Sequence, residues 1–176
     1  GGNSEKFYLI CGIVATFIVG IIIGVLVQHG VDRDIASILV LVPIIAVLVV
    51  VFPEPLNVGK KTTLWAISGI GLGIAFFEIK YNGTGASLQS STGFVAYLYY
   101  IISVAMLQPF FEEIVVRKLL FFGVANIVGP ILSAIFVSIL FALTHRDISV
   151  FAGAFSLAMC WMAWCGISTF NRTVLH

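Results

Sequence analysis

Two adjacent glutamates and an arginine lie inside a long apolar run of this sequence. The run reads Pro-Phe-Phe-Glu-Glu-Ile-Val-Val-Arg, and its charged residues are Glu112, Glu113 and Arg117. An ionisable side chain at the depth of a bilayer costs roughly 2.5–3.5 kcal/mol or more, so charges that persist there usually have a function or a partner. Acid–base chemistry within a membrane is therefore the first hypothesis that the sequence suggests.

The spacing of these charges divides them into two roles. Residues four apart share a helical face, so Arg117 lies over Glu113 in the order that favours an ion pair. Glu112 points about 100° away and needs solvation or a partner from another helix. We expect the Glu113–Arg117 pair to be structural and Glu112 to activate water as a general base. The alternative is one ion network of all three residues that only holds helices together.

Two histidines are further candidates for chemistry. His145 ends an apolar segment, with Phe141 one helical turn earlier, and His176 is the last residue of the sequence. A glutamate and two imidazoles from three separate helices can polarise a water directly or hold a metal that does so. The metal alternative is zinc, bound by Glu112, His145 and His176. The sequence contains no His-Glu-x-x-His motif to support that alternative.

The chain around these residues is strongly apolar. Of its 176 residues, 60% are hydrophobic and 10% are charged, with a mean hydropathy of +1.14, whereas a typical soluble domain is about 25% charged. We therefore expect an all-α, polytopic membrane helix bundle that forms a single domain over residues 1–176. The net charge of +1 gives no support to a nucleic-acid partner. The high hydropathy predicts that a lipid bilayer surrounds the helices.

Hydrophobic runs predict six membrane helices and the start of a seventh near residue 172. The expected spans are 8–27, 35–52, 62–79, 94–122, 128–145 and 148–168. Since a span needs about 20 residues, we expect the fold to continue beyond His176. These boundaries place His145 nearer to the outer surface than Glu112, so a contact between the two would require different boundaries.

Positive charges in the short loops weakly favour a cytoplasmic N-terminus. Five such charges fall on the side of the N-terminus and three on the other. They are Lys6, Lys60, Lys61, Lys118 and Arg172 against Arg33, Lys80 and Arg146.

Small residues four apart predict close helix contacts in two segments. They are Gly20 and Gly24 in the first segment and Gly69 and Gly73 in the third. Glycine has no side chain to keep two backbones apart, so we expect a neighbouring helix at each pair.

The order of the polar motifs resembles the CPBP intramembrane protease family, also called Abi, which includes the type II CAAX prenyl endopeptidases. That family has Glu-Glu-x-x-x-Arg, Phe-x-x-x-His and His-x-x-x-Asn (or a similar small polar residue) on successive membrane helices. The resemblance covers about residues 94–176, and the matching positions are Glu112, Glu113, Arg117, Phe141, His145 and His176. The small polar residue of the last motif would fall four positions after His176.

The resemblance implies an intramembrane endopeptidase that acts on a membrane-associated protein or peptide. Glu112 would activate water with help from His145, and His176 would stabilise the oxyanion or, in a metalloprotease mechanism, bind zinc. The supporting residues would be Glu113, Arg117 and Phe141. We expect a metal-free, glutamate-dependent mechanism, with zinc as the alternative cofactor. The short loops favour a prokaryotic plasma-membrane protein.

Two other classes of function stay open. Members of this broad family also act in bacteriocin immunity or as membrane scaffolds, where a polar cluster would serve folding or partner binding. A proton-coupled transporter would also use buried glutamate and histidine. No inverted repeat or pair of broken helices, which often mark transporters, is visible in the sequence.

Overall fold

The computed structural model describes residues 2–54, 60–81, 93–145 and 149–176. Within these ranges the chain forms seven helices and no strand, counting the unbroken run Phe94–Val128 as one helix, which confirms the predicted all-α fold. The others are α1 (Gly2–Gln28), α2 (Arg33–Val51), α3 (Lys60–Tyr81), α7 (Pro130–Thr144), α8 (Ser149–Trp164) and α9 (Thr169–Leu175).

Fewer helices reach full spanning length than the sequence predicted. Among the described residues, the helices that are long and apolar enough are Lys6–Gln28, Arg33–Val51 and Phe94–Val128. Helices α7 and α8 are apolar but have 15 and 16 residues. The expected seventh segment is the seven-residue helix α9, which begins at Thr169. The set of apolar helices fits an integral membrane protein with a bundle of unequal helices.

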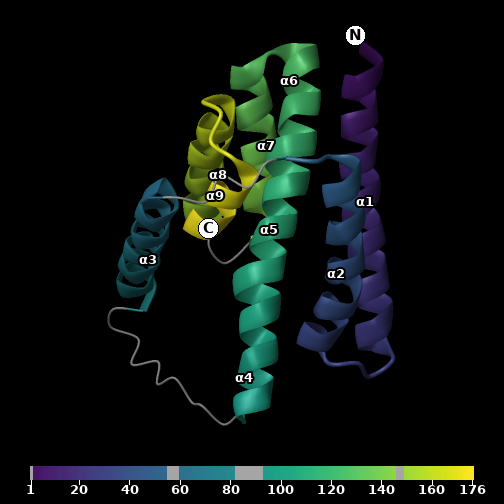
Figure 1. Ribbon diagram of the computed structural model, residues 1–176, viewed down its shortest axis with the longest axis vertical. Helices are drawn as coiled ribbons and strands as arrows, with labels where there is room; N and C mark the ends of the chain where they lie inside the picture. Colours follow the sequence, from purple (N-terminus) through teal and green to yellow (C-terminus); the bar gives the residue numbers. More distant parts are fainter. Residues whose placement is uncertain (1, 55–59, 82–92, 146–148) are drawn as a thin grey trace.

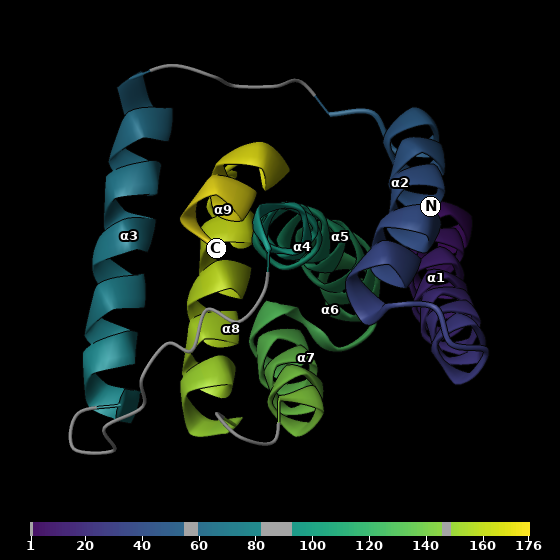
Figure 2. The ribbon, with the colours of Figure 1, turned by 90° about the horizontal axis from the view of Figure 1, so that it is seen from below.

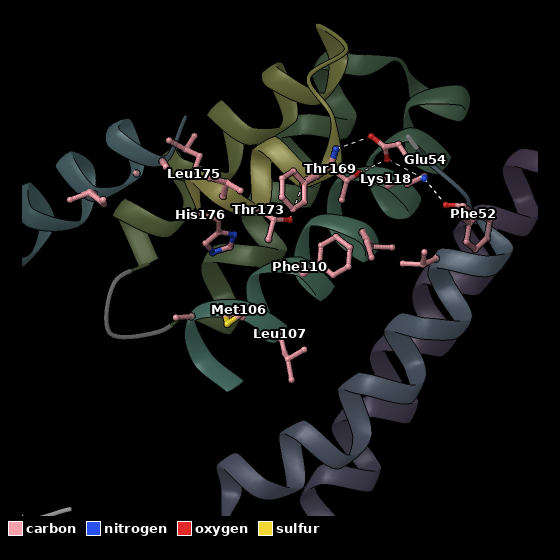
Figure 3. A pocket seen from close by; sticks show the side chains of 18 residues that line it. Phe52, Glu54, Met106, Leu107, Phe110, Lys118, Thr169, Thr173, Leu175 and His176 are labelled. Atoms are coloured by element: carbon pink, nitrogen blue, oxygen red, sulfur yellow. Dashed lines mark hydrogen bonds and ion pairs between the residues drawn. The ribbon is translucent and has the colours of Figure 1, made fainter. Parts of the chain in front are cut away.

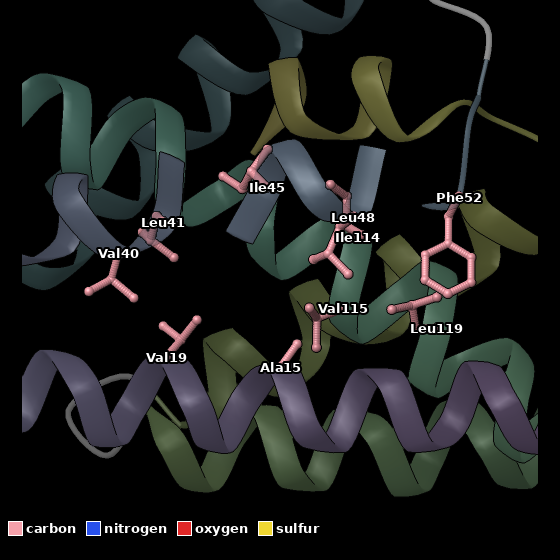
Figure 4. Packing of buried hydrophobic residues seen from close by; sticks show 10 residues of the cluster. All are labelled: Ala15, Val19, Val40, Leu41, Ile45, Leu48, Phe52, Ile114, Val115 and Leu119. Atoms are coloured by element: carbon pink, nitrogen blue, oxygen red, sulfur yellow. The ribbon is translucent and has the colours of Figure 1, made fainter. Parts of the chain in front are cut away.

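The long helix occupies the centre of the bundle (Figures 1 and 2). Helices α1 and α2 pack on one side of it, α7, α8 and α9 pack on the other, and α3 lies at the edge against α9. Figure 4 shows the buried core between α1, α2 and the long helix, formed by Ala15, Val19, Val40, Leu41, Ile45, Leu48, Phe52, Ile114, Val115 and Leu119. The segment that carries the charged motif is therefore held from both sides.

The long helix changes its hydrogen-bonding pattern on both sides of Pro109. It runs through α4 (Phe94–Tyr100), the π-helix η1 (Ile101–Leu107), α5 (Gln108–Glu112), the π-helix η2 (Glu113–Phe121) and α6 (Phe122–Val128). Proline has no N–H for the helical ladder, yet the helix continues through it without a break. The π-helix is rare and is frequently found at functional sites, and here a nine-residue π-helix begins at Glu113.

The chain reversal at Gly129 corrects the predicted end of the fourth segment. The helix was expected to end at residue 122 but continues to Val128, where Gly129 adopts a φ of +90° and Pro130 begins α7. Glycine tolerates this φ, and proline suits the first turn of a helix. Glu112 lies 17 residues before Gly129 and His145 lies 16 residues after it. The antiparallel helices therefore bring both residues to the same level, and the predicted separation between them was wrong.

One of the predicted glycine pairs marks a close helix contact. A Cβ added at Gly69 would overlap the carbonyl oxygen of Leu175, so α3 approaches α9 closely at this glycine. Nothing described lies within 4 Å of a Cβ added at Gly20, Gly24 or Gly73. The prediction was therefore wrong for the first segment and holds for one residue of the third.

Candidate active site

Glu112 lies between the two histidines that the sequence singled out. Its Oε1 is 3.9 Å from Nε2 of His145, and its Oε2 is 3.4 Å from Nε2 of His176. The carboxylate side chain is 26% exposed, so water or a ligand can reach it. Three candidate residues from the end of α5, the end of α7 and the end of α9 thus meet at one place.

Both imidazoles are anchored through Nδ1. In His145 this atom lies 2.8 Å from the carbonyl oxygen of Phe141, and in His176 it lies 3.1 Å from Oε1 of Glu113. A carbonyl or carboxylate oxygen only accepts, so Nδ1–H is the donor in each contact. The Nε2 atom of each ring faces Glu112, and a neutral ring presents that atom as an acceptor.

The gap between Glu112 and the imidazoles suits a water molecule. An ionised carboxylate and two neutral Nε2 atoms are all acceptors. Their separations of 3.4 and 3.9 Å are too long for good direct hydrogen bonds. A bridging water supplies the missing donors at such distances. The arrangement can therefore hold a water whose proton Glu112 is placed to accept.

Glu113 occupies a closed, positively charged environment. Its side chain is 0% exposed, with Arg117 Nη1 at 3.5 Å, Arg172 Nε at 3.3 Å and His176 Nδ1 at 3.1 Å from the carboxylate. The expected Glu113–Arg117 pair is thus confirmed. Two guanidinium groups and the Nδ1–H donor of His176 offset the large cost of burying this carboxylate.

Phe141 contacts both His145, which faces Glu112, and Arg117, which pairs with Glu113. Its ring centroid lies 4.3 Å from the ring centroid of His145 and 4.5 Å from the guanidinium carbon of Arg117. No nitrogen of the Arg117 guanidinium makes a hydrogen bond within the described part of the chain. The ion pair with Glu113 and the cation–π contact with Phe141 therefore hold this buried arginine.

Arg172 is the site residue that the sequence analysis missed. It was counted as a loop charge, but it is 3% exposed. Its guanidinium donates to Oε2 of Glu113 at 3.3 Å, to the carbonyl of Ile167 at 2.7 Å and to the hydroxyl of Thr169 at 3.1 Å. One signal was available, because Arg172 and His176 are four apart and share a helical face. Without Arg172, the count of positive charges is four on the side of the N-terminus against three on the other side. The cytoplasmic orientation of the N-terminus therefore stays a prediction.

An apolar cavity lies beside His176 (Figure 3). Its volume is about 1020 Å³, and its lining includes Met106, Leu107, Phe110 and Leu175. Polar residues line the cavity near the start of α9, where Glu54, Lys118 and Thr169 gather. Cavities of this size with a few polar groups are typical ligand sites. An apolar ligand segment in the cavity would lie next to the imidazole of His176.

The described residues do not form a ready zinc site. Among them, no group of three or more His, Cys, Asp or Glu side chains is arranged to hold a metal ion. Glu112 faces His145 with one oxygen and His176 with the other. The alternative zinc set of Glu112, His145 and His176 therefore finds no support in this geometry.

Comparison with known families identifies the part of the chain that carries the site. Residues 94–176 match the family model described as type II CAAX prenyl endopeptidase Rce1-like. This match confirms the resemblance that the order of the polar motifs indicated. No curated protein and no solved structure matches the chain.

Proposed function

We propose that the chain hydrolyses a peptide bond in a membrane-associated protein or peptide, because residues 94–176 match the family model described as type II CAAX prenyl endopeptidase Rce1-like. The observation that carries the proposal is the position of Glu112, partly exposed between the Nε2 atoms of two anchored imidazoles. The match supports the proposed reaction class, and the geometry supports the roles proposed for individual residues.

Glu112 is the general base in this proposal. It takes one proton from the bridging water while the water oxygen bonds to the carbonyl carbon of the substrate. The resulting tetrahedral intermediate collapses when Glu112 returns that proton to the leaving nitrogen and the C–N bond breaks. A positioned base of this kind typically contributes about 10²–10⁴-fold to the rate.

The two histidines take different parts because their anchors differ. Nδ1–H of His176 donates to the Glu113 carboxylate, so that carboxylate can balance the charge of the imidazolium that forms when the neutral Nε2 takes a proton from solvent water. That Nε2–H can then donate to the oxyanion, an interaction whose loss typically costs about 3–4 kcal/mol. His145 is anchored to the neutral carbonyl of Phe141, so its role is to accept from the attacking water and orient it.

The test is cleavage by purified protein in detergent or liposomes. The probes are a prenylated peptide ending in a CAAX sequence, the same peptide without the prenyl group, and a set of unmodified fluorogenic peptides. Glu112→Gln keeps the shape of the side chain but removes the base, so kcat should fall by about 10²–10⁴-fold. Asp34→Asn, a neutralised acid at the far end of α2, is the control. Unchanged kcat in Glu112→Gln would rule out the mechanism.

A non-catalytic role is the second candidate, and the closed environment of Glu113 favours it. A carboxylate with 0% exposure and three partners serves packing without any need for a reactive neighbour. In a scaffold or immunity protein, Glu112→Ala should preserve the cellular phenotype while Glu113→Ala should lower the amount of folded protein. Loss of the phenotype in Glu112→Ala at normal protein levels would exclude this candidate.

A further inference from the structure

The N-terminus of α9 is held by a residue far away in the sequence. Glu54, which follows α2, accepts a hydrogen bond from the Thr169 N–H at 2.8 Å and another from the Thr169 hydroxyl at 2.6 Å. Lys118 Nζ lies 3.1 Å from the same carboxylate and donates to the Phe52 carbonyl at 2.8 Å. We propose that Glu54 and Lys118 are positioning residues that set the place of His176 through α9. This inference rests on the proposed peptidase function.

Helix α9 depends on outside contacts for its position. It has seven residues from Thr169 to Leu175, with His176 as its C-cap, and isolated helices of that length are marginal. The Glu54 carboxylate meets its first N–H, where a negative charge also interacts favourably with the helix dipole. A shift at Thr169 moves the whole short helix and therefore moves His176.

A chain of contacts connects Glu54 to the proposed reaction centre. The Thr169 hydroxyl donates to Glu54 and accepts from Arg172, which donates to Glu113. Glu113 in turn accepts from Nδ1 of His176. Each member fixes the next, so a loss at the first contact reaches the imidazole through side chains as well as through the helix backbone.

Lys118 ties the same carboxylate to the helix of the general base. It lies on η2, which begins directly after Glu112. Glu54 thus joins the helix that carries Glu112 to the helix that carries His176, and Figure 3 shows this pair at one end of the cavity. Misplacement of reacting groups by about 1 Å can lower a rate by about 10²-fold. This Glu54–Lys118 clamp can therefore change the rate of catalysis without contacting the reacting atoms.

The protonation state of Glu54 suits this role. Partial burial raises its pKa, but the hydrogen bonds from Thr169 and the charge of Lys118 outweigh burial and hold the pKa below its ordinary value. Both carboxylate oxygens are therefore available as acceptors at neutral pH.

Steady-state kinetics with the prenylated CAAX peptide give the first test. Glu54→Ala should lower kcat by about 10–100-fold with KM within about twofold, because it acts on geometry and not on substrate binding. Glu54→Gln keeps one acceptor and should retain more activity than Glu54→Ala, while Asp34→Asn is the matched control. A raised KM with unchanged kcat would mean that Glu54 contacts substrate, which would overturn the proposal.

Thiol alkylation gives a second test that needs no cleavage. In a background with Cys11→Ala and Cys165→Ser, Leu175→Cys introduces a thiol at a position that is 7% exposed. Glu54→Ala should increase the alkylation rate at position 175 by about tenfold or more, whereas the native thiol of Cys160, 0% exposed on α8, should stay protected.

The alkylation result separates the two hypotheses. An unchanged rate at position 175 overturns the clamp, and equal acceleration at Cys160 also overturns it because the whole fold has then loosened. If no peptide is cleaved but position 175 alone becomes reactive, the peptidase proposal fails while the clamp on α9 stands.

Discussion

Glu112 and Glu113 are neighbours in the sequence and occupy opposite environments. Glu113 is fully buried and is contacted by Arg117, Arg172 and His176, while Glu112 is partly exposed and faces two imidazole nitrogens across gaps of 3.4 and 3.9 Å. A helix turns by about 100° per residue, so one step along the chain separates a closed ion network from an open site. The ion network around Glu113 holds the helices in place, and the open side at Glu112 has room for a substrate and water.

His176 belongs to both sides of this comparison. Its Nδ1 meets Glu113 and its Nε2 faces Glu112. The buried network therefore orients a ring that the open site uses. This link predicts that changes on the Glu113 side act first on stability, and that changes on the Glu112 side act on rate.

The largest effect on stability is expected when Glu113 is neutralised. Glu113→Gln leaves the buried guanidiniums of Arg117 and Arg172 without their shared carboxylate, which should cost about 3–5 kcal/mol. Glu112→Gln should change stability by less than about 1 kcal/mol because its side chain is partly exposed and lies 3.4 and 3.9 Å from the two imidazole nitrogens. Denaturation of both variants in the same detergent measures the difference. Equal losses of unfolding free energy in the two variants would contradict the distinction between a structural Glu113 and a reactive Glu112.

Substitution of each histidine tests the same comparison through the rate of cleavage. His176→Ala removes the proposed oxyanion donor and should lower kcat by about 10²–10³-fold, with a moderate loss of stability from the broken Glu113 contact. His145→Ala should lower kcat less, because the ring only orients water, and should leave the Glu113 network intact. Single-turnover cleavage and thermal unfolding of the two variants test this order. A larger rate defect in His145→Ala would reverse the assigned roles.

Local spacing made one part of the site predictable. The Glu113–Arg117 pair followed from two residues four apart on a helix. The common site of Glu112, His145 and His176 was implied only by the resemblance that the order of the motifs carries. The predicted position of His145 along the bundle relative to Glu112 was wrong, because the fourth helix was predicted to end at residue 122 and continues to Val128. The Gly129–Pro130 step, which sets the true turn, was already visible in the sequence.

Contacts between distant segments were not predictable in the same way. Glu54 meets Thr169 across 115 positions of the chain, and no periodicity relates the two residues. Arg172 looked like a loop charge because α9 is too short to show a hydrophobic period. The burial of that arginine depends on Glu113, which lies 59 positions away on another helix. Such pairings arise only when the helices are packed together.

The smallest expected effect is the pH dependence that Glu54 gives to stability. Its pKa in the folded protein lies below the ordinary value of 4.5, so the unfolded chain binds a proton at a higher pH than the folded chain does. The stabilisation from the Thr169 and Lys118 contacts is therefore complete above about pH 5–6 and is lost as the pH falls through the folded pKa. Thermal unfolding of wild type and Glu54→Gln between about pH 6 and pH 3 should show a shallower pH slope in the variant. Because Glu54 is partly open to solvent, the change in slope should be small, and identical slopes would mean that the carboxylate contributes no charge to the clamp.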